Sequence, residues 1–393
     1  MTIIRARHLA TMKGPVIEDG CVIVDAGRVV QVGATSVVRP GRIDEEIDGV
    51  LMPGLMNRHT HLELTNVPRP TTPPATFQDW IAWLGPAIRG DPESFDARRG
   101  DAVRAGIAQC IRFGVTEVWD ISQNVEIVRP ILASAPIRST SFGECLGIGE
   151  RRGRFDVLMR QAMDESLANE RMRIGVSPHA PYTVDERGYA MVLQGTAHGG
   201  IPVMTHLAET EDEGRFLLDH SGAFGGLYAS LGIDAGPAPA FSEGPIAWLR
   251  AIGGAASGII AAHVNYASDE DINHLSAMKA HVVWCPRTHT YFGHPPHRWR
   301  EMQRAGIKVS IGTDSCASSP DLNIVDDLRL VHEQSRDVPV EEIWSLCAGS
   351  LEGGVPGDYV SFPTRSGEPL CEILESPGLL PDGVWVDGAR QTP

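Results

Sequence analysis

No stretch of this sequence approaches the roughly 18 uninterrupted apolar residues of a membrane-spanning helix. The amino terminus, MTIIRARHLATMKG, also lacks the apolar core of a secretory signal peptide. The 7 cysteines are scattered and never form a Cys-x-x-Cys pair, which argues against a disulfide framework and against a thiolate zinc site. We therefore expect a cytoplasmic protein with no membrane partner.

Positive charge is scarce, because 34 Lys and Arg residues face 50 Asp and Glu residues for a net charge of −16. Nucleic-acid binding needs clustered cations to neutralise phosphates. We therefore predict no nucleic-acid partner and a small molecule as substrate. There is no internal repeat and no long run of one charge sign, so a globular chain is favoured.

Several well-known catalytic motifs are absent. The chain contains no Gly-x-Ser-x-Gly, no His-Glu-x-x-His and no P-loop. It also lacks the Pro-Cys-x-x-Cys motif that accompanies His-x-Glu in the zinc deaminases that act on bases of polynucleotides. These absences exclude the commonest serine hydrolase, metalloprotease and nucleotide-hydrolase signatures.

Short alternating runs separated by Gly, Pro and Asp turns occur at both ends of the chain, which is typical of small antiparallel strands. The clearest runs are Cys21–Val24, Val29–Val32, Asp358–Phe362 and Val384–Val386. We predict that residues 1–52 and 354–393 pack together as one small β-sandwich domain.

Residues 53–353 have a different texture, in which apolar runs of strand length alternate with amphipathic helical stretches. Eight candidate strands can be identified: Leu55–His61, Thr116–Ile121, Arg138–Glu144, Arg173–Pro178, Pro202–His206, Gly258–His263, His281–Cys285 and Lys308–Gly312. Eight parallel strands with crossover helices close into a (β/α)₈ barrel, which uses roughly 250 of the 393 residues. The predicted fold class is therefore α/β.

Chemically capable side chains stand at or just after the end of each candidate strand, where barrel enzymes place their active sites. They are His59 and His61, Asp120, Glu144, His179, His206 and Glu209, His263, Arg287 and His289, and Asp314. This placement predicts a catalytic site at the mouth of the barrel.

A metal ion explains why so many imidazoles gather there. His59 and His61 are two residues apart on a strand, so both side chains point to the same face. We assign His59, His61, His206 and Asp314 as its ligands. Three imidazoles and a carboxylate favour Zn²⁺, with Fe²⁺ as the alternative, over Mg²⁺ or Ca²⁺. A further coordination position would hold a water molecule that the ion acidifies toward neutral pH.

The order of motifs resembles a known superfamily. PGLMNRHTHLE, SPHAPYT, THLAE, AAHVNYASDED, CPRTHTYF and GTDSCAS follow one another as in the amidohydrolase superfamily, in its branch of aminohydrolases and chlorohydrolases related to cytosine, guanine and adenosyl-type deaminases. The resemblance implies the same four ligands and a hydrolase that releases ammonia from an amino-substituted nitrogen heterocycle. Because SPHAPY stands where two-metal members carry a carboxylated lysine, a single ion is expected.

The resemblance also assigns proton transfers. It implies that Glu209 protonates a ring nitrogen and then the departing amine, and that His263 orients or deprotonates the attacking water. Asp314 would share this role as base. His179 would contact a nitrogen or oxygen of the substrate, or else be a capped histidine in a proline-flanked turn.

Two segments are candidates for the substrate pocket. Trp80 and Trp83 lie in FQDWIAWL, which reads as a short amphipathic helix, and they would either stack on the substrate or pack in the core. Arg287, His289, Tyr291 and Phe292 combine a cation with aromatic faces, which would suit a planar, anionic substrate. Arg58 should face away from the two histidines toward the helices, where its charge needs a partner.

These motifs are compatible with more than one substrate class. HTHLELT, TFQDWI and CPRTHTYFGHPP are most similar to aminodeoxyfutalosine deaminases of the route to menaquinone. The same activated water could instead displace chloride from a triazine-like ring or open a cyclic amide. A non-catalytic binding protein on the same fold is the remote alternative. Similar proteins often form homodimers, which we also take as an expectation.

Overall fold

The computed structural model describes residues 1–148, 152–197, 199–254 and 258–392. Two four-stranded parallel sheets make up its centre, in the orders β5-β6-β7-β8 and β9-β10-β11-β12. The strands are β5 (Leu55–Thr60), β6 (Val115–Ser122), β7 (Arg138–Cys145), β8 (Met172–Pro178), β9 (Met204–Leu207), β10 (Ile260–His263), β11 (His281–Trp284) and β12 (Lys308–Ile311). Single parallel bridges, Thr60 to Asp314 and Val176 to Val203, join the two sheets at both edges. The eight strands therefore close into the predicted (β/α)₈ barrel.

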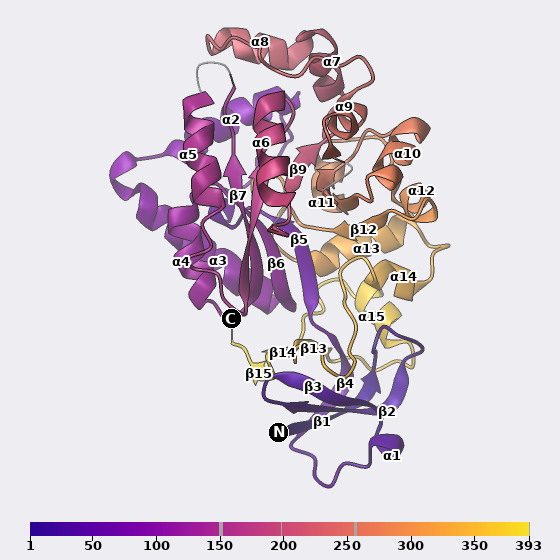
Figure 1. The fold of residues 1–393 in the computed structure, drawn as a ribbon. Helices are drawn as coiled ribbons and strands as arrows, with labels where there is room; N and C mark the ends of the chain where they lie inside the picture. The colour runs from indigo at the N-terminus through magenta and orange to yellow at the C-terminus, as the bar shows by residue number, and fades with distance from the viewer. Residues whose placement is uncertain (149–151, 198, 255–257, 393) are drawn as a thin grey trace.

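Helices cover the outside of the barrel, as Figure 1 shows. They are α2 (Phe77–Arg89), α3 (Phe95–Arg112), α4 (Val125–Ser134), α5 (Arg152–Ala162), α6 (Glu186–Ala197), α7 (Glu211–Asp219), α8 (Gly222–Ser230), α9 (Pro245–Ala251), α10 (Asp269–Ala277), α11 (Pro286–Tyr291), α12 (Trp299–Arg304), α13 (Ile324–Gln334), α14 (Val340–Trp344) and α15 (Pro369–Glu375), with two 3₁₀ turns, η1 (Leu62–Leu64) and η2 (Pro92–Ser94). Among the described helices, none is both long and apolar enough to cross a membrane.

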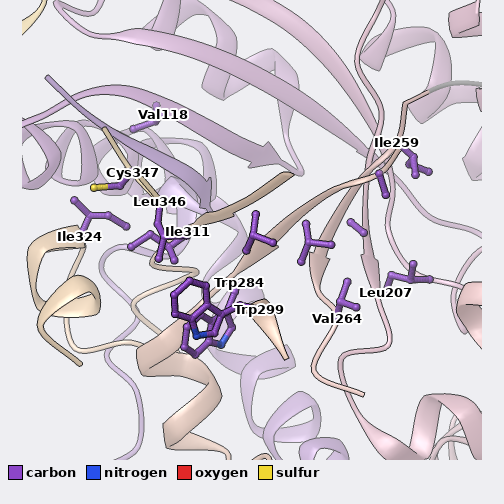
Figure 2. Close-up of a cluster of buried hydrophobic side chains, with 14 of the residues drawn as sticks. Val118, Leu207, Ile259, Val264, Trp284, Trp299, Ile311, Ile324, Leu346 and Cys347 are labelled. Carbon is purple, nitrogen blue, oxygen red and sulfur yellow. The ribbon is translucent and has the colours of Figure 1, made fainter. Parts of the chain in front are cut away.

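The strands are buried on both faces, as expected of a parallel sheet under helices. Figure 2 shows the outer layer, where Val118, Leu207 and Ile311 from three barrel strands share one buried cluster with Ile324 of α13. A second, smaller cluster fills the barrel interior with side chains such as Phe142 of β7. The two cores fix the strands from both sides and so hold the strand ends in place.

The strands of both termini form one continuous seven-stranded sheet, in the order β15-β14-β13-β4-β1-β2-β3. They are β1 (Thr2–Leu9), β2 (Ile17–Asp25), β3 (Arg28–Ala34), β4 (Glu45–Pro53), β13 (Tyr359–Phe362), β14 (Gly383–Val386) and β15 (Ala389–Arg390), with the short helix α1 (Thr35–Val38) after β3. Antiparallel pairing of β13 with β4 unites the two ends of the chain, and the sheet has a core of its own. Figure 1 shows it at one end of the molecule, with α2, α7 and α8 at the other.

Arg58 does not lie where strict strand alternation predicts. Its guanidinium carbon is 5.5 Å from the centroid of the Trp119 ring. Trp119 in turn packs against Phe142 and His281, which come from other strands of the barrel interior. The pairing of β5 with β6 shifts register within β5, so the alternation is interrupted and Arg58 shares the interior with its neighbour His59. The prediction that Arg58 faces the helices was therefore wrong.

Candidate metal centre and active-site cavity

Four side chains from three strand ends converge at the mouth of the barrel. His59 ends β5 with His61 just beyond it, His206 lies in β9, and Asp314 follows β12. The His61 Nε2 atom is 3.4 Å from His206 Nε2 and 3.5 Å from Asp314 Oδ1, and His59 Nε2 is 3.7 Å from that same oxygen. The structure thus brings together all four residues predicted as ligands.

The spacing of these atoms suits a metal ion. Donors held about 2.1 Å from a tetrahedral zinc ion lie about 3.4 Å apart, which is close to the distances seen here. His206 Nδ1 donates a hydrogen bond to the His179 carbonyl at 2.9 Å, so His206 Nε2 keeps its lone pair. The buried Nε2 of His59 has no hydrogen-bond partner in the described chain, and a bound cation would satisfy it. The donor set therefore fits the predicted ion.

Burial also prepares these histidines for metal binding. It lowers the pKa of His61 to about 3. It also lowers the pKa of His206 to about 3, with smaller effects from neighbouring groups. It lowers the pKa of His59 well below its ordinary value as well. Each imidazole is therefore neutral near pH 7, which is the state that binds metals.

Three residues at the ends of barrel strands have a strained, left-handed backbone. Ala208, His263 and Asp314 have φ angles of +49°, +70° and +61°, a left-handed region that costs a non-glycine residue about 1–3 kcal/mol. These residues end or follow β9, β10 and β12. The bend at Ala208 comes directly before Glu209, and His263 and Asp314 adopt the bend themselves; Glu209, His263 and Asp314 all line the cavity.

Glu209 and His263 face each other beside the four donors. The His263 Nε2 atom is 3.5 Å from Glu209 Oε1, and both side chains are buried. Burial, and then the negative charges of Asp314 and Glu213, raise the pKa of Glu209 well above its usual range. In the metal-free chain, this raised pKa favours the protonated form of Glu209.

The peptide of Glu209 is held from both sides. The buried Glu213 carboxylate accepts hydrogen bonds from the N–H groups of Ala208 and Glu209, at 3.1 and 3.0 Å. On the other side, the Asn265 side chain donates to the Glu209 carbonyl at 3.0 Å, and His289 Nδ1 donates to Asn265 Oδ1 at 2.9 Å. His289, predicted to contact substrate, thus contacts the back of the catalytic turn.

A cavity of about 310 Å³ opens above these residues. Its inner end is lined by His61, His206, Glu209, His263 and Asp314. A larger open groove of about 730 Å³ runs over the terminal sheet, but there Arg5 pairs with Asp19 and Arg7 with Asp48. The smaller cavity is therefore the candidate active site.

Two of the six predicted substrate contacts line this cavity, His179 and Trp80. His179 Nδ1 lies 2.7 Å from the Thr183 hydroxyl, which fixes the ring. The Trp80 Nε1 atom donates to the Ala317 carbonyl at 3.0 Å. Trp83, from the same helix α2, is half-buried but does not line the cavity.

Arg287 and Tyr291 also lie off the cavity, which differs from our expectation. The Arg287 guanidinium is 2.8 Å from Asp321 Oδ1 and 2.9 Å from Asp327 Oδ2, so two aspartates already balance its charge. The Tyr291 hydroxyl donates to the Pro70 carbonyl, and its ring packs under Arg69. Neither residue presents a free group to a substrate.

Glu144 is a cavity residue to which the sequence assigned no role. It ends β7, is buried, and neither carboxylate oxygen has a partner within hydrogen-bond distance in the described chain. Its nearest basic atom is His179 Nε2, at 3.9 Å. Burial raises the pKa of Glu144, and His206 lowers it in part. Its position at a strand end was the signal that could have identified it.

Comparisons with known proteins agree with this geometry. The model of the Amidohydrolase family matches residues 50–345. A 5-methylthioadenosine/S-adenosylhomocysteine deaminase of Pelotomaculum thermopropionicum is 26% identical over 98% of this chain and 83% of its own length. An aminodeoxyfutalosine deaminase of Deinococcus radiodurans is 26% identical over 83% and 78%. The crystal structure of an adenosine deaminase from Xanthomonas campestris with bound zinc is 21% identical, with a TM-score of 0.80 over 99% of this chain and 92% of that one.

Proposed function

Because this chain belongs to the amidohydrolase family, we propose that it is a metal-dependent hydrolytic deaminase that releases ammonia from an amino-substituted nitrogen heterocycle of the adenine-nucleoside type. The observation that carries the proposal is the meeting of four metal-donor side chains, whose His61–His206, His61–Asp314 and His59–Asp314 distances are 3.4, 3.5 and 3.7 Å, with the buried Glu209–His263 pair. We propose Zn²⁺ as the ion, with Fe²⁺ as the alternative, held by His59, His61, His206 and Asp314.

The chain's own residues perform the proton transfers. When bound, the ion supplies a water molecule acidified toward neutral pH. His263 and Asp314 hold that water against the ring carbon and take its proton. Glu209 donates its proton to the adjacent ring nitrogen. This proton is needed because attack on the carbon breaks the aromatic system and leaves negative charge on that nitrogen. The deprotonated Glu209 then takes the proton of the new hydroxyl group and passes it to the amine, the carbon–nitrogen bond breaks, and ammonia leaves as the carbonyl forms. The proton that His263 and Asp314 took from the water returns to Glu209.

The candidate substrates follow from the names of the relatives. We propose 5-methylthioadenosine and aminodeoxyfutalosine as the first compounds to test, because deaminases of both resemble this chain over most of its length. Turnover of aminodeoxyfutalosine would connect the enzyme to menaquinone formation. A cytoplasmic location and a homodimer remain predictions.

The test is an ammonia assay on the metal-loaded protein and its Glu209→Gln variant. We expect the wild type to release ammonia from adenine-type nucleosides. The variant should keep its metal but lose about 100-fold or more in kcat, the usual contribution of a proton-transfer group. Turnover of chlorotriazines or cyclic amides alone would overturn the proposed reaction. Equal activity of the two proteins would overturn the role of Glu209.

A further inference from the structure

The outer half of the cavity is an apolar wall built from two helices. Trp80, Ile81, Leu84 and Ile88 line it from α2, and Leu227 and Leu231 line it from α8 and its C-cap. Helix α2 begins at a Thr76–Asp79 capping box, which fixes the start of its apolar face. Leu231 is 55% exposed at the mouth, so a ligand there would cover apolar surface that now faces water.

The charged side chains that line this cavity are acidic in the described part of the chain, and Arg154 of α5 acts on Glu144 from outside the lining. Among the described residues that line it, Glu144, Glu209 and Asp314 are carboxylic acids, and none is a lysine or an arginine. Arg287 lies outside the cavity, where Asp321 and Asp327 neutralise it. A substrate carboxylate held against this apolar wall would lose part of its hydration without gaining a cation from the described lining residues, which is unfavourable.

The volume of the cavity also favours a substrate with a short substituent. Its volume of about 310 Å³ is near the lower end of the range of about 300–1,000 Å³ for small-molecule sites. The inner end must hold the heterocycle next to His61, His206 and Glu209. Little room is then left for a long substituent.

We propose that the preferred substrate is a compact adenine-type nucleoside whose remaining substituent is short, uncharged and apolar, and that the enzyme discriminates against the same ring carrying a carboxylate. This inference rests on the proposed deaminase function and selects among its candidates. A methyl or methylthio group fits the leucine-lined wall, whereas an amino-acid or benzoate group does not. The choice disfavours aminodeoxyfutalosine.

The first experiment measures kcat/KM for ammonia release by the metal-loaded enzyme on four nucleosides. Two are uncharged, 5′-deoxyadenosine and 5′-methylthioadenosine, and two carry a carboxylate, S-adenosylhomocysteine and aminodeoxyfutalosine. We expect kcat/KM to be about 100-fold or more higher for the uncharged pair, because burying an unpaired charge costs several powers of ten in affinity. Equal or higher values for the carboxylates would overturn the inference.

The second experiment places a cation on the wall. Leu231→Arg should raise the ratio of carboxylate to uncharged kcat/KM about tenfold, and it should fold because Leu231 is exposed. Leu218→Arg is the matched control: Leu218 is also 55% exposed, lies on the neighbouring helix α7 and does not line the cavity. This control should leave the ratio unchanged. No change with Leu231→Arg, or the same change in both variants, would contradict the proposed wall contact.

The outcomes separate this inference from the function on which it rests. Ammonia from guanine or cytosine, with none from any adenine nucleoside, would overturn the adenine-nucleoside class, both here and in the proposed function, and would leave only hydrolytic deamination in place. Ammonia from no amino heterocycle at all would overturn both.

Discussion

Arg287 shows how a buried charge can be structural. Its guanidinium bonds to Asp321 and to the fully buried Asp327. Removing one partner of such a pair leaves an uncompensated charge and costs about 3–5 kcal/mol. We therefore predict that Arg287→Met lowers the free energy of unfolding by about that amount in urea titrations, with KM unchanged in the protein that remains folded.

A matched variant makes this prediction specific. Arg300 pairs with Asp337 on the surface, and exposed pairs contribute little, so Arg300→Met should change stability much less. If Arg287→Met raised KM and left stability unchanged, Arg287 would contact the substrate and would not serve the fold.

The sequence predicted that four metal-binding residue types would meet at the barrel mouth, and the structure places them there, while their role as ligands stays a prediction. His59, His61, His206 and Asp314 could be selected because few other roles explain such groups at strand ends. Arg287 could not be placed, because the two aspartates that neutralise it lie more than thirty residues further along the chain. A cation beside aromatic residues looks the same in sequence whether or not it is already paired.

The turn between β9 and α7 is the element that positions Glu209, the proposed proton donor. Glu213 accepts two backbone N–H groups at its start, and Asn265 bonds to the Glu209 carbonyl. We predict that Glu213→Ala and Asn265→Ala lower kcat about tenfold or more while KM and metal content stay near wild type, because a small misplacement of a catalytic group is costly. Glu213→Gln, which keeps one acceptor, should recover part of the loss.

Kinetics and metal analysis distinguish this role from a general loss of structure. If kcat stayed unchanged and only KM rose, or if metal and activity were lost together, the turn would not act through Glu209.

Barrel elements were predictable and the cavity wall was not. Each predicted strand coincides with a barrel strand to within about two residues at either end. Burial on both faces leaves a clear apolar composition in strands such as His281–Trp284, although β7 is largely polar. Helix α8, by contrast, is rich in glycine and apolar residues, and nothing in that composition shows which neighbour it will face. Arg58 was misplaced for a related reason, since a register shift inside a strand leaves no sequence signal.

On the scale of the whole molecule, buried acids and buried histidines set the pH dependence of stability. Burial raises the pKa of Asp120 to about 7 and of Glu213 to about 8. The stability from these acids is complete below about pH 4, the range of the unfolded values, and is lost as pH rises through about 7 to 8. Burial lowers the pKa of His281 to about 3; such histidines have the opposite effect, but only below about pH 6.5.

We therefore predict that the free energy of unfolding of the metal-free protein falls as the pH rises from about 6.5 to about 9. Urea titrations after chelation measure this change without the contribution of metal binding. Glu213→Gln removes one of the responsible carboxyl groups, so its stability should fall less over the same range. A wild-type stability that rises with pH in this window would contradict the assignment of these acids.

The central claim is that four side chains from three strand ends hold one catalytic ion. The most direct test is a crystal structure of the metal-loaded protein, with anomalous diffraction at the zinc and iron edges. The account predicts one anomalous peak within about 2.0–2.2 Å of His59 Nε2, His61 Nε2, His206 Nε2 and an Asp314 oxygen. Two peaks, or a single peak that these four atoms do not surround, would contradict it.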